Sequence, residues 1–174
     1  MFATLVTIAT SVVFAVAAPP SSLDARAGAP IPVPVHPILN TSKCMGIVGG
    51  VYANGTQVDI FDCNDSASQN WAINGGTLPG LSSFSSTTTG TNTYCLDAGV
   101  PADYADGVQM KIWKCFSGLA QQTWNKLESG QIQLANTDFC LDLTNGDTTN
   151  RNVLQIWTCT DGDTNQIWKI DSPH

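Results

Sequence analysis

The sequence predicts an all-β domain built from three homologous units. Three observations predict this fold class: the residues after position 40 are rich in Thr, Asn, Asp and Gly and poor in helix formers, one order of motifs occurs three times, and all six cysteines fall inside these repeats. Short apolar runs such as 153–157 are typical of strands, and Asn-Gly-Asp and Asp-Gly-Asp are typical of the turns between them. Three such units can close around a pseudo-threefold axis.

The first 35 residues are expected to lie outside the repeats. Residues 1–17 are apolar, carry no charged side chain and end in Ala-Val-Ala, which predicts a secretory signal peptide. Residues 18–35 are rich in Pro, Ala and Ser and are interpreted as a linker or pro-segment. We therefore expect a secreted, extracellular protein whose folded domain spans residues 36–174. No other stretch is apolar enough to cross a bilayer, so membrane insertion is not expected.

The charge pattern argues against several classes of function. The net charge of the 174-residue chain is −7, and no cluster of Lys or Arg offers a surface for phosphate groups, so nucleic acid is not an expected partner. The two histidines, His36 in the linker and His174 at the end, leave no Ser-His-Asp or Cys-His arrangement. We expect no enzymatic activity, no metal and no cofactor.

Each unit has a leading cysteine, a second cysteine that follows a strand, and a closing Gln-x-Trp. The leading cysteines lie 51 and 45 residues apart (44 to 95, then 95 to 140), and the tryptophans lie 53 and 44 apart (71 to 124, then 124 to 168). This spacing indicates one supersecondary unit used three times, over about 36–78, 79–130 and 131–174. The motifs are Cys44-Met45-Gly46, Phe61-Asp62-Cys63 and Gln69-Asn70-Trp71; Cys95-Leu96-Asp97, Trp113-Lys114-Cys115 and Gln122-Thr123-Trp124; and Cys140-Leu141-Asp142, Trp157-Thr158-Cys159 and Gln166-Ile167-Trp168.

These motifs resemble the ricin B-type lectin family over residues 36–172. The resemblance implies a β-trefoil of twelve short strands with pseudo-threefold symmetry and one pocket per unit for galactose or a related sugar. Six cysteines allow 15 pairings. The repetition favours one bridge within each unit, because each unit is then closed in the same way. Each such bridge is expected to stabilise the fold by about 3 kcal/mol. The expected bridges are Cys44–Cys63, Cys95–Cys115 and Cys140–Cys159.

The bridges also predict how the strands face one another. If Cys140 faces Cys159 across an antiparallel pair, then Asp142 faces Trp157, and the two side chains emerge on the same face. The same count in the other units predicts two further pairs, Asp97 with Trp113 and Gly46 with Phe61.

The third unit carries the first candidate for a sugar site. A carboxylate can accept hydrogen bonds from two adjacent hydroxyls, an aromatic ring can cover the C–H face of a hexose, and a side-chain amide can both donate to and accept from hydroxyls. These groups match the pattern of the family that the unit resembles. The candidate residues are Asp142, Gln155, Trp157, Asn165 and Gln166.

The second unit keeps the carboxylate and the ring but changes the amides. Asp97 and Trp113 stand at the matching positions, Lys111 replaces Gln155, and Gln121 replaces Asn165. Because Lys can donate but cannot accept, we expect a second sugar site with an altered preference.

The first unit has Gly46 in place of the carboxylate, with Asp59, Phe61 and Ser68 at the other positions, and we expect no sugar site there. All three Asn-x-Ser/Thr sequons fall in this unit, and a glycan at Asn54 is expected to crowd its pocket. The candidate glycosylation sites are Asn40, Asn54 and Asn64.

The closing tryptophans are assigned to the core, and the glutamines two residues before them to hydrogen bonds with backbone groups. The sequence as a whole predicts a secreted lectin, monomeric or weakly associating, that binds galactose- and N-acetylgalactosamine-type glycans through the third and second units. The alternative is a β-trefoil protease inhibitor or defence protein that acts through exposed loops, of which the Ser/Thr-rich segment Ser82–Thr93 is the candidate.

Overall fold

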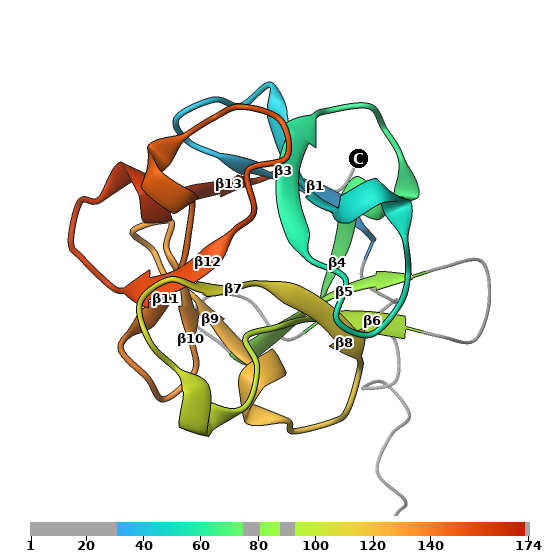
Figure 1. The fold of residues 1–174 in the computed structure, drawn as a ribbon. Coiled ribbons are helices and arrows are strands. Elements are labelled where there is room, and N and C mark those ends of the chain that lie inside the picture. The colour runs from blue at the N-terminus through green and yellow to red at the C-terminus, as the bar shows by residue number, and fades with distance from the viewer. Residues whose placement is uncertain (1–30, 75–80, 88–92, 173–174) are drawn as a thin grey trace, which may run out of the picture.

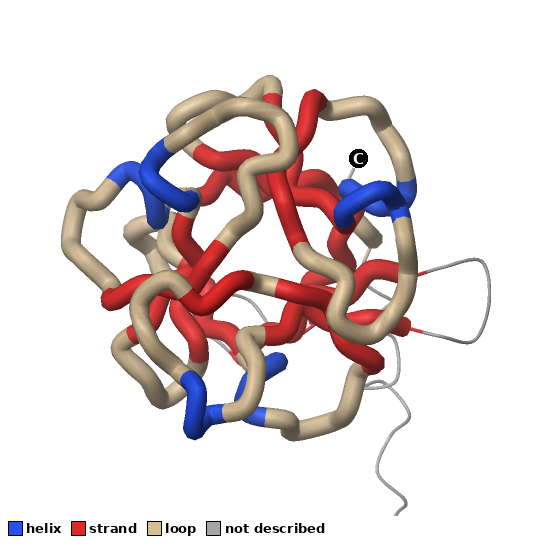
Figure 2. Tube along the Cα trace, in the orientation of Figure 1, coloured by secondary structure: helices blue, strands red, loops and turns tan. Residues whose placement is uncertain are grey.

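The computed structural model describes residues 31–74, 81–87 and 93–172 of the chain. In these ranges the regular structure consists of β-strands and six 3-10 helices of three residues each. Figure 2 colours the strands red and these short helices blue. The expected signal peptide and most of the expected linker lie outside the described residues. Among the residues described, no helix has the length and apolar character that a membrane span requires.

The strands form three lobes around a common centre (Figure 1). The first lobe contains β1 (Val33–Pro37), β2 (Lys43–Ile47), β3 (Val58–Asp62) and β4 (Asn70–Asn74). The second contains β5 (Leu81–Thr87), β6 (Thr93–Asp97), β7 (Val108–Gln109), β8 (Lys111–Lys114) and β9 (Trp124–Lys126). The third contains β10 (Ile132–Leu134), β11 (Phe139–Asp142), β12 (Gln155–Thr158) and β13 (Trp168–Ile170). The predicted all-β trefoil is confirmed, with β7 and β8 as the two parts of one interrupted strand.

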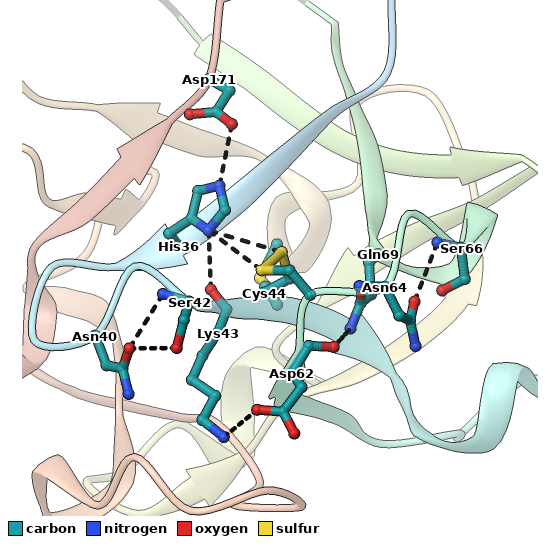
Figure 3. Close-up of a disulfide and its surroundings, with 12 residues drawn as sticks. His36, Asn40, Ser42, Lys43, Cys44, Asp62, Asn64, Ser66, Gln69 and Asp171 are labelled. Atoms are coloured by element: carbon teal, nitrogen blue, oxygen red, sulfur yellow. Dashed lines mark hydrogen bonds and ion pairs between the residues drawn. A yellow bond between two sulfur atoms is a disulfide. The ribbon is translucent and has the colours of Figure 1, made fainter.

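The first and last strands close the trefoil. Strand β1 pairs antiparallel with both β4 and β13, so the expected boundary after residue 35 falls inside a strand, and residues 33–35 belong to the trefoil. His36, expected in the linker, is instead buried at this joint (Figure 3). Its Nδ1 donates to the carbonyl of Lys43 at 2.9 Å, and its Nε2 lies 3.1 Å from the carboxylate of Asp171. That hydrogen bond favours the ionised carboxylate and lowers the pKa of Asp171.

The closing tryptophans lie in the shared core, as predicted. Strand alternation directs every second side chain inward, and Trp71 and Trp124 have no exposed surface while Trp168 is 4% exposed. Each of these three indole N–H groups donates to a backbone carbonyl of the strand that carries the first cysteine of its own lobe (β2, β6 or β11). Burial therefore leaves none of the three indole nitrogens unpaired. The acceptors are Met45, Leu96 and Leu141, at 3.0, 3.3 and 3.0 Å.

Each lobe has one disulfide. It links the strand with the first cysteine (β2, β6 or β11) to the residue that follows its paired strand (β3, β8 or β12), and all three predicted pairings are confirmed. The Cα–Cα distances are 5.1 Å for Cys44–Cys63, 5.0 Å for Cys95–Cys115 and 5.0 Å for Cys140–Cys159. Each bridge therefore fixes the strand pair on which a candidate site stands.

The expected exposed loop at Ser82–Thr93 is wrong for its first half. Residues 82–87 belong to β5, which pairs with β4, β6 and β9. Phe84 anchors this strand with no exposed surface, and the hydroxyl of the buried Ser85 donates to the carbonyl of Ala72, so these two side chains tie the Ser/Thr-rich segment to the fold. Residues 88–92 lie outside the described ranges. The segment on which the inhibitor alternative depends is therefore largely strand.

Candidate functional site

The strand register differs from the prediction by two residues. Cys140 lies opposite Trp157, and Asp142 lies opposite Gln155. The reason is that Cys159 lies beyond the end of β12, so the disulfide reaches diagonally across the strand pair. Because two residues are one full strand period, Asp142 and Trp157 still project from the same face. The same correction holds in the other lobes, where the observed pairs are Asp97 with Lys111 and Gly46 with Asp59.

A cavity of about 230 Å³ opens at this face of the third lobe. Trp157 forms one wall and is 41% exposed, which is unusual for so large an apolar ring. Four of the five residues predicted for this site line the cavity, together with two that were not predicted. The lining residues are Asp142, Gln155, Trp157 and Asn165, with Asn145 and Asp163 in addition.

The carboxylate of Asp142 is buried but oriented. One oxygen accepts a hydrogen bond of 2.8 Å from the amide of Gln155, on the facing strand. Burial disfavours the charged form and raises the pKa of Asp142, and the hydrogen bond from Gln155 opposes this shift. The carboxylate is thus held in one orientation at the base of the cavity.

Gln166 does not line the cavity, although it is among the predicted site residues. Its side chain is fully buried, accepts from the N–H of Thr160 and donates to the carbonyl of Thr158. The equivalent Gln122 donates to the carboxylate of Asp97 at 2.9 Å. The glutamine of Gln-x-Trp therefore supports the strand end and the carboxylate from behind, and it does not face a ligand.

The loop of the preceding lobe borders each site. In the third lobe, Asp106 accepts hydrogen bonds from the N–H and the hydroxyl of Thr158, at 2.6 and 2.9 Å. A Cβ on the neighbouring Gly107 would lie 4.0 Å from the ring of Trp157, so this loop packs along the edge of the indole. The third site is consequently bordered by a loop of the second unit, while the residues that line its cavity all belong to the third.

The second lobe has a cavity of about 290 Å³. The structure brings together all four residues predicted for it, namely Asp97, Lys111, Trp113 and Gln121. Both oxygens of Asp97 are bonded, one to the N–H of Gly99 at 2.8 Å and one to Gln122, and the ammonium of Lys111 lies 3.8 Å from the first. Trp113 is 38% exposed and offers the same kind of ring as Trp157.

The first lobe differs from the other two in its carboxylate. A side chain at Gly46 would start 3.2 Å from Gln69 and 3.7 Å from Asp59. The only carboxylate that lines its cavity, among the residues described, comes from Asp59 on the facing strand. The first cavity therefore does have a carboxylate, but it comes from Asp59 and not from the position of Gly46. The glycine at this position is the feature from which the sequence predicts a unit without a sugar site.

The ricin-type β-trefoil lectin domain matches this chain over residues 34–171. The chain belongs to this family of lectins. A search of curated proteins finds no match to it. Carbohydrate binding is the activity of the family, and the three cavities lie at equivalent places in its three units.

Solved structures confirm the fold of the lectin. A designed threefold-symmetric protein, ThreeFoil, matches with a TM-score of 0.70 and 17% identity over 82% of this chain and 99% of that chain. The C-terminal half of an earthworm R-type lectin, in complex with GalNAc, matches with a TM-score of 0.58 and 19% identity over 83% and 100%. The ricin B-like lectin of Macrolepiota procera, in complex with lactose, matches with a TM-score of 0.57 and 19% identity over 82% and 95%.

Two cavity residues of the lectin escaped the sequence reasoning. Asn145 has a φ of 56°, in the left-handed region, and it lines the same cavity as Asp142. Asp163 accepts a hydrogen bond of 2.9 Å from the N–H of Asn165, which orders the opposite rim. Both belong to turns, and the Asn-Gly and Asp-x-Asn patterns there are the signals that could have indicated them.

The sequon at Asn54 lies elsewhere than expected. Its Oδ1 accepts a hydrogen bond of 2.8 Å from the N–H of Lys114 in the second lobe, and a Cβ on Gly55 would lie 3.9 Å from the ring of Trp113. The expectation that it crowds the first pocket is therefore wrong, because the loop between β2 and β3 packs on the next unit. Asn64 lines the first cavity, and Asn40 accepts from the backbone and hydroxyl of Ser42.

Proposed function

We propose that this lectin binds galactose- and N-acetylgalactosamine-type glycans through its third and second units. The observation that carries the proposal is the shared cavity of Asp142 and Trp157, in which a fixed carboxylate lies beside an exposed indole. The same pair of groups recurs as Asp97 and Trp113 in the second cavity.

The chemistry of these groups suits a hexose. The carboxylate of Asp142 accepts charge-assisted hydrogen bonds from two neighbouring hydroxyls. The indole of Trp157 covers the C–H patch that a galactose-type ring presents on one face. The amides of Gln155 and Asn165 serve hydroxyls that both donate and accept. None of these steps breaks a bond, so the protein holds its glycan without altering it.

Two lectins of the same fold support the choice of sugar, since one is in complex with GalNAc and the other with lactose. In the second unit Lys111 replaces an amide, so we propose that this site tolerates a different substituent near the carboxylate. Each site alone is expected to bind with a Kd on the order of 1 mM. Two sites on one rigid body gain affinity on branched or surface glycans by multivalency, and the expected setting is extracellular.

Calorimetry with lactose tests the proposal. Wild-type protein is compared with Asp142→Ala, Asp97→Ala and the control Asp147→Ala, whose carboxylate lies in a turn and, among the residues that the structure describes, bonds only to Thr149. We expect each site variant to lose one of two sites, the double variant to lose both, and the control to retain both. Unchanged lactose binding in a folded Asp142→Ala protein would refute the assignment of the primary site.

A further inference from the structure

The loop between β11 and β12 carries an arginine where the equivalent loops carry glycine. The backbone N–H groups of Gly55, Gly107 and Arg151 each donate to an isoleucine carbonyl of the next lobe, which makes the three positions equivalent. Their φ angles are 87°, 90° and 75°. Glycine adopts this left-handed conformation freely, whereas a side chain there is strained. Arg151 therefore occupies a position that favours glycine.

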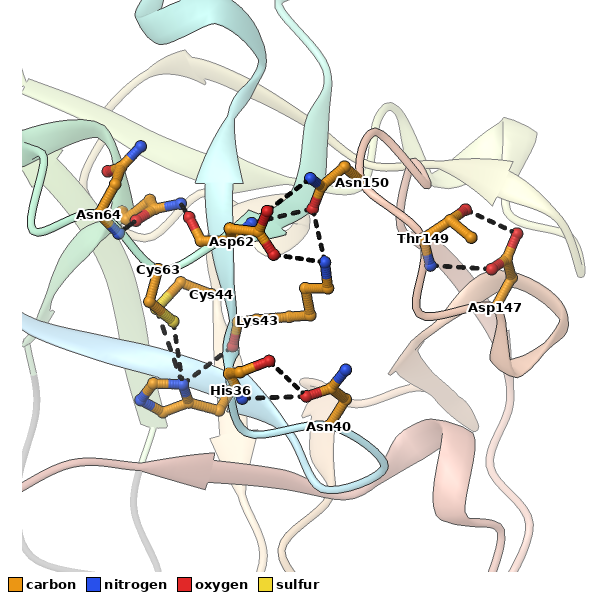
Figure 4. Close-up of polar contacts among 12 residues, drawn as sticks. His36, Asn40, Lys43, Cys44, Asp62, Cys63, Asn64, Asp147, Thr149 and Asn150 are labelled. Carbon is orange, nitrogen blue, oxygen red and sulfur yellow. Dashed lines mark hydrogen bonds and ion pairs between the residues drawn. A yellow bond between two sulfur atoms is a disulfide. The ribbon is translucent and has the colours of Figure 1, made fainter.

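The same loop is fastened to the first lobe (Figure 4). The side-chain oxygen of Asn150 accepts from the N–H of Asp62 at 2.9 Å and from the ammonium of Lys43 at 2.8 Å. Its amide nitrogen donates to the carboxylate of Asp62 at 2.8 Å. This network fixes the backbone next to Arg151 and places the arginine over the first unit's cavity.

The guanidinium of Arg151 covers the ring that would otherwise stack on a sugar. Its Cζ lies 4.9 Å from the centroid of Phe61, the residue that corresponds to Trp113 and Trp157. The side chain is nevertheless 55% exposed, so the outer edge of the planar group, with its N–H donors, faces the solvent.

Asp59 holds this arginine from below. Its side chain is 3% exposed, and its Oδ2 lies 3.6 Å from a terminal nitrogen of Arg151, close enough for an ion pair but too far for a hydrogen bond. In the described part of the chain, Oδ2 has no hydrogen-bond partner. A buried carboxylate behind an exposed guanidinium orients the latter toward the cavity.

The cavity at this place has about 380 Å³, compared with about 290 Å³ and 230 Å³ in the other lobes. Small polar side chains line part of it, namely Asn64, Ser66 and Ser68. Gly49 and Gly50 form another part of the lining and leave it open. The space is sufficient for one sugar residue, and the rim offers partners for hydroxyls.

We propose that this cavity is a third saccharide site, selective for acidic sugars such as hexuronates, whose carboxylate binds the free edge of the Arg151 guanidinium. In the other two units the protein supplies the carboxylate and the sugar supplies hydroxyls. Here the protein supplies the guanidinium, so the absence of a carboxylate at Gly46 does not exclude a ligand. A neutral hexose gains little, because the face of Phe61 is already covered.

The test uses protein made in a bacterial host, which adds no glycan to Asn64, with Asp97→Ala and Asp142→Ala to silence the other sites. Binding of glucuronic acid and galacturonic acid is measured beside that of glucose and galactose. Arg151→Gly restores the residue of the equivalent positions and is expected to fold. Arg151→Lys keeps the charge but not the planar pair of donors.

We expect the hexuronates to bind at least about tenfold more tightly than the hexoses, and Arg151→Gly to abolish this preference, with Arg151→Lys in between. If the double variant does not fold, the Arg151 Nε–H resonance of wild-type protein is followed during a glucuronate titration, and it is expected to shift. Equal binding of acidic and neutral sugars, or a preference that survives Arg151→Gly, would overturn the proposal. Lactose binding by wild-type protein, measured in parallel, reports separately on the other two sites.

Discussion

The amide of Gln155 donates to the carboxylate of Asp142 from the directly opposite position on the paired strand, at 2.8 Å. This one contact links the strand register, which the disulfide Cys140–Cys159 fixes, to the orientation of the group proposed to bind hydroxyls. The second unit has a lysine at the matching position, and Asp97 is oriented by Gln122 and the backbone N–H of Gly99. The two sites therefore share support from the Gln-x-Trp glutamine, Gln122 or Gln166, and differ in the second group that orients the carboxylate.

The first prediction concerns that contact. Gln155→Leu removes the donor while keeping a side chain of similar size, and it leaves Asp142 without its facing partner. We expect the affinity of the third site for lactose to fall by about tenfold, the value of one hydrogen bond to a charged group. Calorimetry in an Asp97→Ala background isolates this site. Gln57→Leu, at an exposed position, serves as the control and should leave the affinity unchanged.

The second prediction concerns the pH dependence of binding at the third site. Burial raises the pKa of Asp142, and the sugar's hydroxyls require the ionised form as their acceptor. Protonation therefore removes binding as the pH falls, and it does so at a higher pH than an ordinary aspartate near 3.9 would. Lactose affinity in the Asp97→Ala background, measured from pH 7.5 to pH 4, checks this. Affinity that stays constant down to pH 4 would contradict the assigned acceptor.

The third prediction separates the two classes of tryptophan. Trp124→Phe leaves a void in the core and an unpaired carbonyl at Leu96, so the free energy of unfolding should fall by about 1 to 3 kcal/mol. Trp113→Phe, at a 38% exposed position, should change it by less than about 0.5 kcal/mol but weaken lactose binding at the second site. Urea unfolding and calorimetry measure the two effects. If Trp113→Phe lowered the stability and Trp124→Phe weakened lactose binding, the assignment of Trp124 to the core and of Trp113 to the sugar site would be wrong.

The fourth prediction concerns the buried carboxylate of the first unit. Burial raises the pKa of Asp59 to about 6, and Arg151 offsets only part of this. The pKa in the folded state is higher than the usual value of 3.8, so the folded protein binds the proton more tightly than the unfolded chain does. This contribution to the free energy of unfolding is fully present below pH 3.8 and is lost as the pH rises through about 6. Asp59→Asn removes the carboxyl that titrates, so the stability of the variant does not decrease in this way. Between pH 4 and pH 7.5 its free energy of unfolding should therefore rise by about 2 kcal/mol relative to that of wild type. Urea unfolding at the two pH values would show no such gain if Asp59 were solvated.

Much of the fold could be predicted because the repeats make it overdetermined. Cysteine and tryptophan spacing fixed the three units, and a local bridge in each followed from their equivalence. The register was wrong by two residues because a disulfide can join neighbours that are not directly opposite, a geometric detail that spacing does not carry. The face of Asp142 and Trp157 was nevertheless right, since strand side chains repeat every two residues.

The contacts between units could not be predicted from motifs. Nothing in the sequence around Asn54 or Asp106 says that these loops pack on the next lobe, because that follows from closure of the trefoil. Arg151 is the clearest case. Its partners Asp59 and Phe61 are about 90 residues away in the chain, and only the folded arrangement brings them together. Strand formation by the Ser/Thr-rich residues 82–87 likewise depends on partners far away in the sequence.

The indole N–H resonance of Trp157 tests the central claim most directly. In a lactose titration of wild-type protein followed by proton–nitrogen NMR, this signal should shift in a saturable manner, and the shift should vanish in Asp142→Ala. The indole signals of the buried Trp71, Trp124 and Trp168 should remain in place. If Trp157 stays unchanged at saturating lactose, or shifts equally without Asp142, the third unit's cavity is not the sugar site.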